Sequence, residues 1–287
     1  MLGPRPGGPG WLAGRVAGAR RTHGLQHDGG TPPRANADLE RNPTMQPTET
    51  LDDFLAGARV DPAVFALRPD YRALLVVARG IVPGPSDEAS DALLRAAEAR
   101  AETLLAEAPA ESLPHVASWR EAYRAFGAKP QRTRNSLEAL VRRAGAGLPR
   151  VNRLTDLYNA ISVLHQLPLG GEDLHRYAGP PRLLRATGTE PFDTAADGGS
   201  IIEHPDQGEV VWTDPAGVTC RRWNWRQARR TQLTDETTAV LFILDALDPV
   251  DDDALRAAGD DLADRVSLLG PDVRVARRLI ALDPTTA

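Results

Sequence analysis

The spacing of apolar residues changes at Leu167, and this change constrains the fold more than any other feature of the chain. Before it, apolar residues recur with helical spacing; after it, short extended segments alternate with turn residues. Helices are predicted over Ser86–Ala108, His115–Phe126, Thr133–Ala144, Asn152–Gln166 and Asp251–Leu268. Extended segments are predicted over Arg182–Thr187, Gly199–Glu203, Glu209–Thr213, Gly217–Arg222, Thr237–Leu247 and Val273–Leu282. Helices followed by a sheet predict an α+β fold, with a mixed sheet flanked by helices.

The region before Ser86 divides into two parts. Residues 1–47 are rich in Gly, Pro, Arg and Ala without periodicity, which predicts a disordered extension, and Met45 is a second candidate for the first residue. Residues 48–287 are expected to form a single domain. It begins with a short helix capped by Thr50, followed by extended runs at Ala63–Leu67 and Tyr71–Ile81, and Ser86 is expected to cap the next helix.

Charge is unevenly distributed along the 287 residues, although the net charge is only −5. Residues 119–153 hold nine basic and two acidic side chains, whereas residues 232–287 hold five basic and twelve acidic ones. A basic surface on an acidic protein indicates a specific anionic partner, with a solvated helix face as the alternative. The candidates for phosphate contact are Arg120, Arg124, Lys129, Arg132 and Arg134.

The chain has one cysteine, Cys220, which excludes an internal disulfide and a multi-cysteine zinc site. The histidines show no metal spacing, so we expect no metal and no cofactor. An apolar run of about 18 residues is absent from the sequence, so no membrane span is expected. These features predict a cytoplasmic protein.

The segment from Val218 to Gln227 is the strongest candidate for a functional site. Trp223 and Trp225 stand among arginines and amides, and guanidinium groups, indole faces and amides suit a pocket for a phosphate, a carboxylate or a stacked base. Arg222, Asn224 and Arg226 are the candidates from this segment. Cys220 beside Arg221 is either a thiol of lowered pKa or a small core residue.

A second group of polar residues lies between Asn152 and Asp173. Asn152 is predicted to cap its helix, and Asn159 follows on that helix beside an apolar stripe that includes Tyr158. Gly170 and Gly171, a pair expected to form a turn, precede Glu172 and Asp173, whose carboxylates suit an amine or ribose hydroxyls. These residues either line a pocket or form ordinary polar surface.

Taken in order, these segments resemble the B3/B4 domain, the tRNA-binding and editing domain of the phenylalanyl-tRNA synthetase β subunit. The resemblance starts at Leu148-Pro149-Arg150-Val151-Asn152 and the Asp156 to Asn159 helix, and it continues through Leu167–Asp173, Arg182–Glu190, Glu209–Asp214 and Leu233–Leu241. Stand-alone bacterial proteins of this domain, which have no attached synthetase, are similar in their Gly-Gly-Glu-Asp segment and in a Trp-Asn-Trp-Arg signature like Trp223–Arg226.

The resemblance implies an α+β domain with an unusual β-sandwich. In the synthetase, this domain hydrolyses tyrosine wrongly esterified to tRNA, so the resemblance implies tRNA rather than DNA as the expected partner. Asn152, Tyr158, Asn159 and Asp173 carry over by motif. The catalytic positions do not, because the synthetase has a histidine where this chain has Gly170, and its Gly-rich pocket segment is replaced by Arg221–Gln227.

Three functions follow as hypotheses. The first is a free-standing protein that binds aminoacyl-tRNA and hydrolyses a mischarged ester in trans, with Arg222, Asn224 and Arg226 as hydrogen-bond donors and Glu172 or Asp173 holding the amino group. The second is an RNA-binding module without hydrolysis. The third is a pocket for an amino acid that works independently of RNA. The sequence does not resemble an aminoacylation core.

Overall fold

The computed structural model describes residues 50–196 and 199–283. The expected disordered extension, residues 1–47, and Met45 lie outside these ranges. The helices are α1 (Leu51–Gly57), α2 (Pro62–Leu67), α3 (Glu88–Glu107), α4 (Pro114–Ala125), α5 (Ser136–Ala144), α6 (Arg153–Leu164) and α7 (Asp252–Ser267), with short 3₁₀ turns at Ala110–Ser112 and Leu174–Arg176. The strands are β1 (Arg59–Val60), β2 (Arg72–Arg79), β3 (Leu169–Asp173), β4 (Arg182–Arg185), β5 (Phe192–Ala196), β6 (Gly199–Glu203), β7 (Val210–Asp214), β8 (Gly217–Arg221), β9 (Arg226–Gln227), β10 (Ala239–Ala246) and β11 (Arg274–Ala281).

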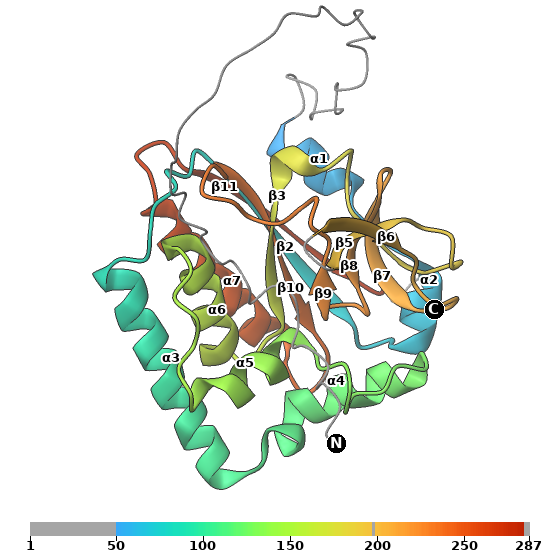
Figure 1. The fold of residues 1–287 in the computed structure, drawn as a ribbon, viewed down its shortest axis with the longest axis horizontal. Helices are drawn as coiled ribbons and strands as arrows, with labels where there is room; N and C mark the ends of the chain where they lie inside the picture. The colour runs from blue at the N-terminus through green and yellow to red at the C-terminus, as the bar shows by residue number, and fades with distance from the viewer. Residues whose placement is uncertain (1–49, 197–198, 284–287) are drawn as a thin grey trace, which may run out of the picture.

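A four-stranded antiparallel sheet in the order β11-β2-β10-β3 forms the centre of the fold. Every residue of β10 is buried, since both faces of this strand are covered. Helices α6 and α7 cover one face, and α3 packs outside α6 (Figure 1). Continuous apolar sequence in a strand is the expected result of burial on both faces.

The opposite face of the central sheet packs against a second sheet, in the order β1-β4-β7-β8-β9. Their common core contains Leu75 and Ile243 from the central sheet and Trp212 from the second. The hairpin of β5 and β6 lies beside the second sheet (Figure 1). The two sheets form a β-sandwich with helices on its outer side, which confirms the predicted α+β class.

Helix ends follow local capping chemistry. Asn152 caps α6, because its side-chain Oδ1 accepts a hydrogen bond of 2.8 Å from the backbone N–H of Thr155. Thr50 caps α1 in the same way, as predicted. The predicted cap of α3 is wrong by one residue: Asp87 caps this helix, and the Ser86 hydroxyl donates to Asp156 instead.

Two other predictions of local structure are corrected. Ala63–Leu67 is helical rather than extended, because Pro62 at the first helical position presets the backbone and the helix buries Val64 and Phe65. The glycine pair lies in strand β3 rather than in a turn. A Cβ at Gly171 would lie only 3.1 Å from the Tyr158 ring, so this glycine lets α6 pack closely on the sheet.

In the described ranges, no helix is long and apolar enough to cross a membrane.

Candidate functional site

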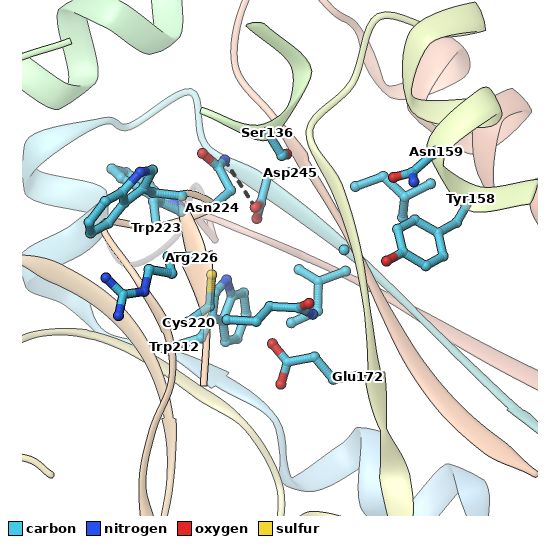
Figure 2. A pocket seen from close by; sticks show the side chains of 15 residues that line it. Ser136, Tyr158, Asn159, Glu172, Trp212, Cys220, Trp223, Asn224, Arg226 and Asp245 are labelled. Carbon is cyan, nitrogen blue, oxygen red and sulfur yellow. Dashed lines mark hydrogen bonds between the residues drawn. The ribbon is translucent and has the colours of Figure 1, made fainter. Parts of the chain in front are cut away.

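A cavity opens between the two sheets, beside the edge strand β3. Its walls come from both sheets, from α6 and from the start of α5 (Figure 2). Trp212, Leu169 and Ile243 supply apolar surface. The empty space is about 500 Å³ when the open solvent at the mouth is counted. The enclosed part of the cavity is narrow. Its volume is about 40 Å³, which is room for a few water molecules.

Two buried carboxyl groups line this cavity. Glu172 lies on β3 and Asp245 on the neighbouring strand β10, and each side chain is 2% exposed. Because side chains alternate along a strand, both point toward the second sheet rather than toward α6. The Glu172 Oε2 atom accepts a hydrogen bond of 2.5 Å from the Tyr177 hydroxyl, and the Asp245 Oδ1 atom accepts one of 2.6 Å from the Tyr71 hydroxyl.

Burial changes the proton affinity of both groups. Loss of solvation raises the pKa of Asp245 to about 7, hydrogen bonds from Tyr71 and Asn224 oppose the rise, and the nearby Glu172 adds to it. Loss of solvation also raises the pKa of Glu172 above its usual range. Asp245 is therefore a carboxyl group that changes its charge near neutral pH.

Several side chains that line the cavity have buried polar atoms without a hydrogen-bond partner in the described residues, among them Asn159 and Ser136. Asn159, on α6, is 1% exposed, yet neither its Oδ1 nor its Nδ2 has a partner within the part of the chain that the structure describes. The buried Oγ of Ser136, at the start of α5, likewise has no partner there. Buried polar groups are normally hydrogen-bonded, so these atoms are suited to contact a ligand or ordered water.

The turn between β8 and β9 carries the two neighbouring tryptophans and directs them to different environments. Arg222 and Trp223 both have positive φ, 47° and 68°, a backbone conformation that is strained for residues other than glycine. The Trp223 ring is fully buried, with ring centroids 4.9 Å from Tyr71 and 5.2 Å from Trp119. Trp225 stays half-buried, and the Arg222 guanidinium lies 4.5 Å from its ring.

Arg226 and Gln227 line the cavity from β9, opposite β3. The Arg226 guanidinium donates to Thr194 and lies 3.7 Å from Glu203, so part of its hydrogen-bonding capacity is used. The Gln227 Nε2 atom donates to the backbone oxygen of Gly171 over 2.7 Å. This bond links the second sheet to the edge of the central one.

Beside this turn lies a groove bordered by the exposed side chains of Lys129 and Arg132 and by half-buried Arg222. Asp206 and Glu209 also border it, and both form ion pairs with Arg222. In the described residues no ion pair involves Lys129 or Arg132, so their charges face solvent. Arg222 thus joins this groove to the Trp225 side of the cavity.

The other three basic candidates differ in availability. Arg124 is exposed. Arg120 is not free for phosphate contact, because its guanidinium donates to the fully buried Glu138 carboxylate over 2.7 Å. Arg134 lies 3.6 Å from the same carboxylate. Arg120 therefore compensates a buried charge inside the protein, which corrects its sequence-based interpretation.

The structure places the eight predicted pocket residues in three settings. The cavity is lined by Tyr158, Asn159, Glu172, Asn224 and Arg226. Arg222 borders the groove. Asn152 and Asp173 line neither: Asn152 caps α6, and the Asp173 carboxylate accepts hydrogen bonds of 2.8 Å from the Thr237 hydroxyl and 2.9 Å from the His175 backbone. For these last two, helix and turn geometry replaces the predicted pocket role.

Sequence reasoning missed Asp245, Ser136 and Gln227. For Asp245 a signal was present, since it is a carboxylate inside the apolar run Thr237–Leu247, where a charge is costly unless it serves a purpose. Cys220 also lines the cavity, but burial raises the pKa of its thiol well above the usual range. It is therefore a core residue and not an activated thiolate.

Fold and site together define an α+β protein with an acid-lined cavity between two sheets. Residues 118–266, just over half of the 287, match the family model described as B3/4 domain. The chain therefore belongs to the B3/4 domain family, and the predicted resemblance is confirmed.

Among solved structures, the chain is similar to an N-terminal fragment of the phenylalanyl-tRNA synthetase β subunit from Pyrococcus horikoshii. The identity is 12% and the TM-score 0.39, over 78% of this chain and 54% of that one. The chain thus spans about half the length of that fragment. No curated protein sequence matches.

Proposed function

We propose that this protein binds aminoacyl-tRNA and hydrolyses the ester of a mischarged amino acid in trans. Membership of the B3/4 domain family, and the likeness to a fragment of a tRNA synthetase subunit, suggest tRNA as the class of partner. The observation that carries the proposal is the position of the acid-lined cavity beside a groove with free basic side chains. An amino acid would enter the cavity while the nucleic acid to which it is esterified lies along the groove.

The groove offers sequence-independent contacts to phosphates. Lys129 and Arg132 are exposed there, and Arg222 extends the positive charge toward Trp225 at the cavity. Contacts of this kind position a nucleic acid rather than read its bases. We therefore assign tRNA binding to Lys129 and Arg132, with exposed Arg124 on the preceding helix, and not to Arg120.

The chemistry would be carried by polar side chains that lack partners. Ester hydrolysis needs a water held near the carbonyl carbon and a donor for the negative charge that develops on the carbonyl oxygen. The Asn159 Nδ2 atom is a donor at the cavity without a partner in the described residues, and the Ser136 hydroxyl can hold the water. Asn224 does not fill the donor role expected from sequence, because its amide already bridges Tyr123 and Asp245.

Binding without hydrolysis is the second candidate. Two observations favour it. Burial raises the pKa of Cys220, the one thiol of the chain, so a thiolate nucleophile is disfavoured. In the described residues, no serine of the cavity has a histidine beside it that could activate it. Catalysis would then depend on water alone. A protein that binds aminoacyl-tRNA tightly and leaves its ester intact would fit this candidate.

A deacylation assay tests the first candidate. tRNAs carrying tyrosine and a panel of other amino acids are incubated with the protein, and the loss of ester is compared with the spontaneous rate. We expect at least one ester to be cleaved faster than it decays spontaneously, and the Asn159→Leu variant to lose that activity. Spontaneous rates across the whole panel, together with salt-dependent binding, would instead favour the binding function.

A further inference from the structure

The two carboxyl groups of the cavity lack a positively charged partner. Glu172 and Asp245 are each 2% exposed, and their hydrogen bonds come from neutral groups, the hydroxyls of Tyr177 and Tyr71 and the amide of Asn224. Within residues 50–196 and 199–283, neither carboxylate forms an ion pair with a basic side chain. Buried carboxylates are normally paired, because desolvation of an unpaired charge is costly.

The basic residue with an electrostatic effect on Glu172 is already occupied. Arg230 acts on Glu172 through space, but its guanidinium is held by Asp214, with N–O distances of 2.7 and 2.9 Å. Two other buried acids of this protein are paired with arginines. Glu138 accepts a hydrogen bond from the Arg120 guanidinium, and Glu209 forms a bidentate ion pair with Arg221 at 2.8 and 2.9 Å. Buried Asp156 and Asp173 also form no ion pair in the described residues, but each accepts a hydrogen bond from a backbone N–H. Glu172 and Asp245 differ from these two because they line the cavity.

We infer that the cavity is a receptor for the unblocked primary ammonium group of an α-aminoacyl ligand, which the carboxylates of Glu172 and Asp245 attract. This inference deepens the proposed function and rests on it for the source of the ligand. An ammonium group has a positive charge, which an uncompensated carboxylate attracts, and three N–H donors, so it needs a further acceptor besides a carboxylate. The Oδ1 atom of Asn159, which lines the same cavity without a partner, can be that acceptor.

The mouth of the cavity offers apolar surface for the side chain of an aminoacyl group. Apolar surface from Leu169, Ile243 and Trp212 would surround its side chain. Acylation of the amine removes the charge and two of the donors, so the site should discriminate strongly against N-acylated ligands. An ester of tRNA and a free amino acid both present this ammonium group, and the experiment below separates them.

The test measures binding of amino acid amides to the full chain by calorimetry, without tRNA. The probes are L-tyrosinamide, L-phenylalaninamide, L-leucinamide and L-alaninamide, each compared with its N-acetyl derivative on the wild-type protein. We expect at least one amide to bind, and its N-acetyl form to bind at least tenfold more weakly. Equal affinity for the two forms, or no binding of any amide at 10 mM (a concentration of roughly 100 times a 0.1 mM Kd), would overturn the inference.

Two variants locate the effect. Glu172→Gln and Asp245→Asn should each weaken binding of the best amide at least fivefold, whereas Glu236→Gln, which neutralises an exposed acid, should leave the affinity unchanged. Unaltered affinity in both cavity variants would contradict the inference. The comparison of free and acetylated amines needs only the wild-type protein, so it decides the matter even if a variant fails to fold.

A further arm identifies the source of the ligand. If the free amino acid binds as tightly as its amide, the receptor serves free amino acids. If the amide binds more tightly, the receptor serves esterified ones. Binding of amines without deacylation of any tRNA would refute the proposed hydrolysis and retain the ammonium receptor. Deacylation of N-acetylated aminoacyl-tRNA as fast as of aminoacyl-tRNA with an unblocked amine would retain the proposed hydrolysis and refute the ammonium receptor.

Discussion

The Asn224 side chain donates from Nδ2 to Oδ2 of Asp245 over 3.2 Å, and this bond links the β8–β9 turn of one sheet to the central strand of the other (Figure 2). The same amide accepts a hydrogen bond of 2.9 Å at Oδ1 from the Tyr123 hydroxyl. Asn224 is therefore oriented at both ends. The turn that directs Trp223 into the core also brings the Asn224 amide to Asp245. Burial raises the pKa of this carboxyl group to about 7.

Replacement of Asp245 by Asn should change how stability depends on pH. The folded-state pKa is raised from 3.8 to about 7, so the folded protein keeps a proton that the unfolded chain releases. This contribution to stability is present at low pH and is lost as pH rises toward about 7. Relative to wild type, the Asp245→Asn variant should gain roughly 2–3 kcal/mol in unfolding free energy between pH 5 and pH 8.

Urea denaturation of both proteins at several pH values measures this difference. His115 acts in the opposite direction, since burial lowers its pKa to about 4 and stability falls as pH drops below about 6.5. Because His115 is present in both proteins, its effect cancels in the difference. Parallel stability curves for the two proteins would show that Asp245 is ionised in the fold at all these pH values.

Asn159→Leu should separate stability from activity. A buried amide without partners costs roughly 1–3 kcal/mol, and a leucine of similar size removes that cost. We expect thermal denaturation to show equal or higher stability, and the deacylation rate to fall at least tenfold. Asn152→Ala is the matched control on the same helix: loss of its cap should cost about 1 kcal/mol and leave activity unchanged. Loss of stability in Asn159→Leu would indicate a partner for this amide.

The double substitution Lys129→Ala and Arg132→Ala should weaken tRNA binding equally for all tRNAs. Each removed phosphate contact should reduce the slope of log K against log salt by about 1, so the double variant should lose about 2. Binding titrations between 50 and 200 mM salt measure this slope, where the salt range is roughly that over which such contacts are strongly screened. An unchanged slope would remove the groove from the tRNA interface.

Arg120→Ala should act on stability instead. Its guanidinium neutralises Glu138, which is 0% exposed, although Arg142 also donates to this carboxylate over 2.9 Å. Because one compensating cation remains, we expect a loss of about 1–3 kcal/mol in unfolding free energy rather than complete unfolding. The salt slope of tRNA binding should stay as in wild type. A changed slope with unchanged stability would return Arg120 to the RNA-binding surface.

Local sequence determined much of the secondary structure. The apolar run of β10 and the Asn152 cap follow from propensities and spacings that act within a few residues. Local sequence patterns predicted the wrong structure where packing against a distant element determines the backbone conformation. Gly170 and Gly171 are typical of a turn, but the space needed by Tyr158 from α6 makes Gly171 a strand residue. Their role depends on a packing partner that no local pattern contains.

The α+β order and the family could be predicted from sequence, and five of the eight predicted pocket residues do line the cavity. Which acids share that cavity, and which basic residues are left without an ion pair in the described residues, depends on how distant segments pack together. Asp173 and Glu172 are neighbours in sequence, yet alternation along β3 gives Asp173 an internal hydrogen bond from Thr237 and places Glu172 in the wall of the cavity. Burial, pKa and pairing depend on groups that distant segments bring together, and these are properties of the folded chain alone.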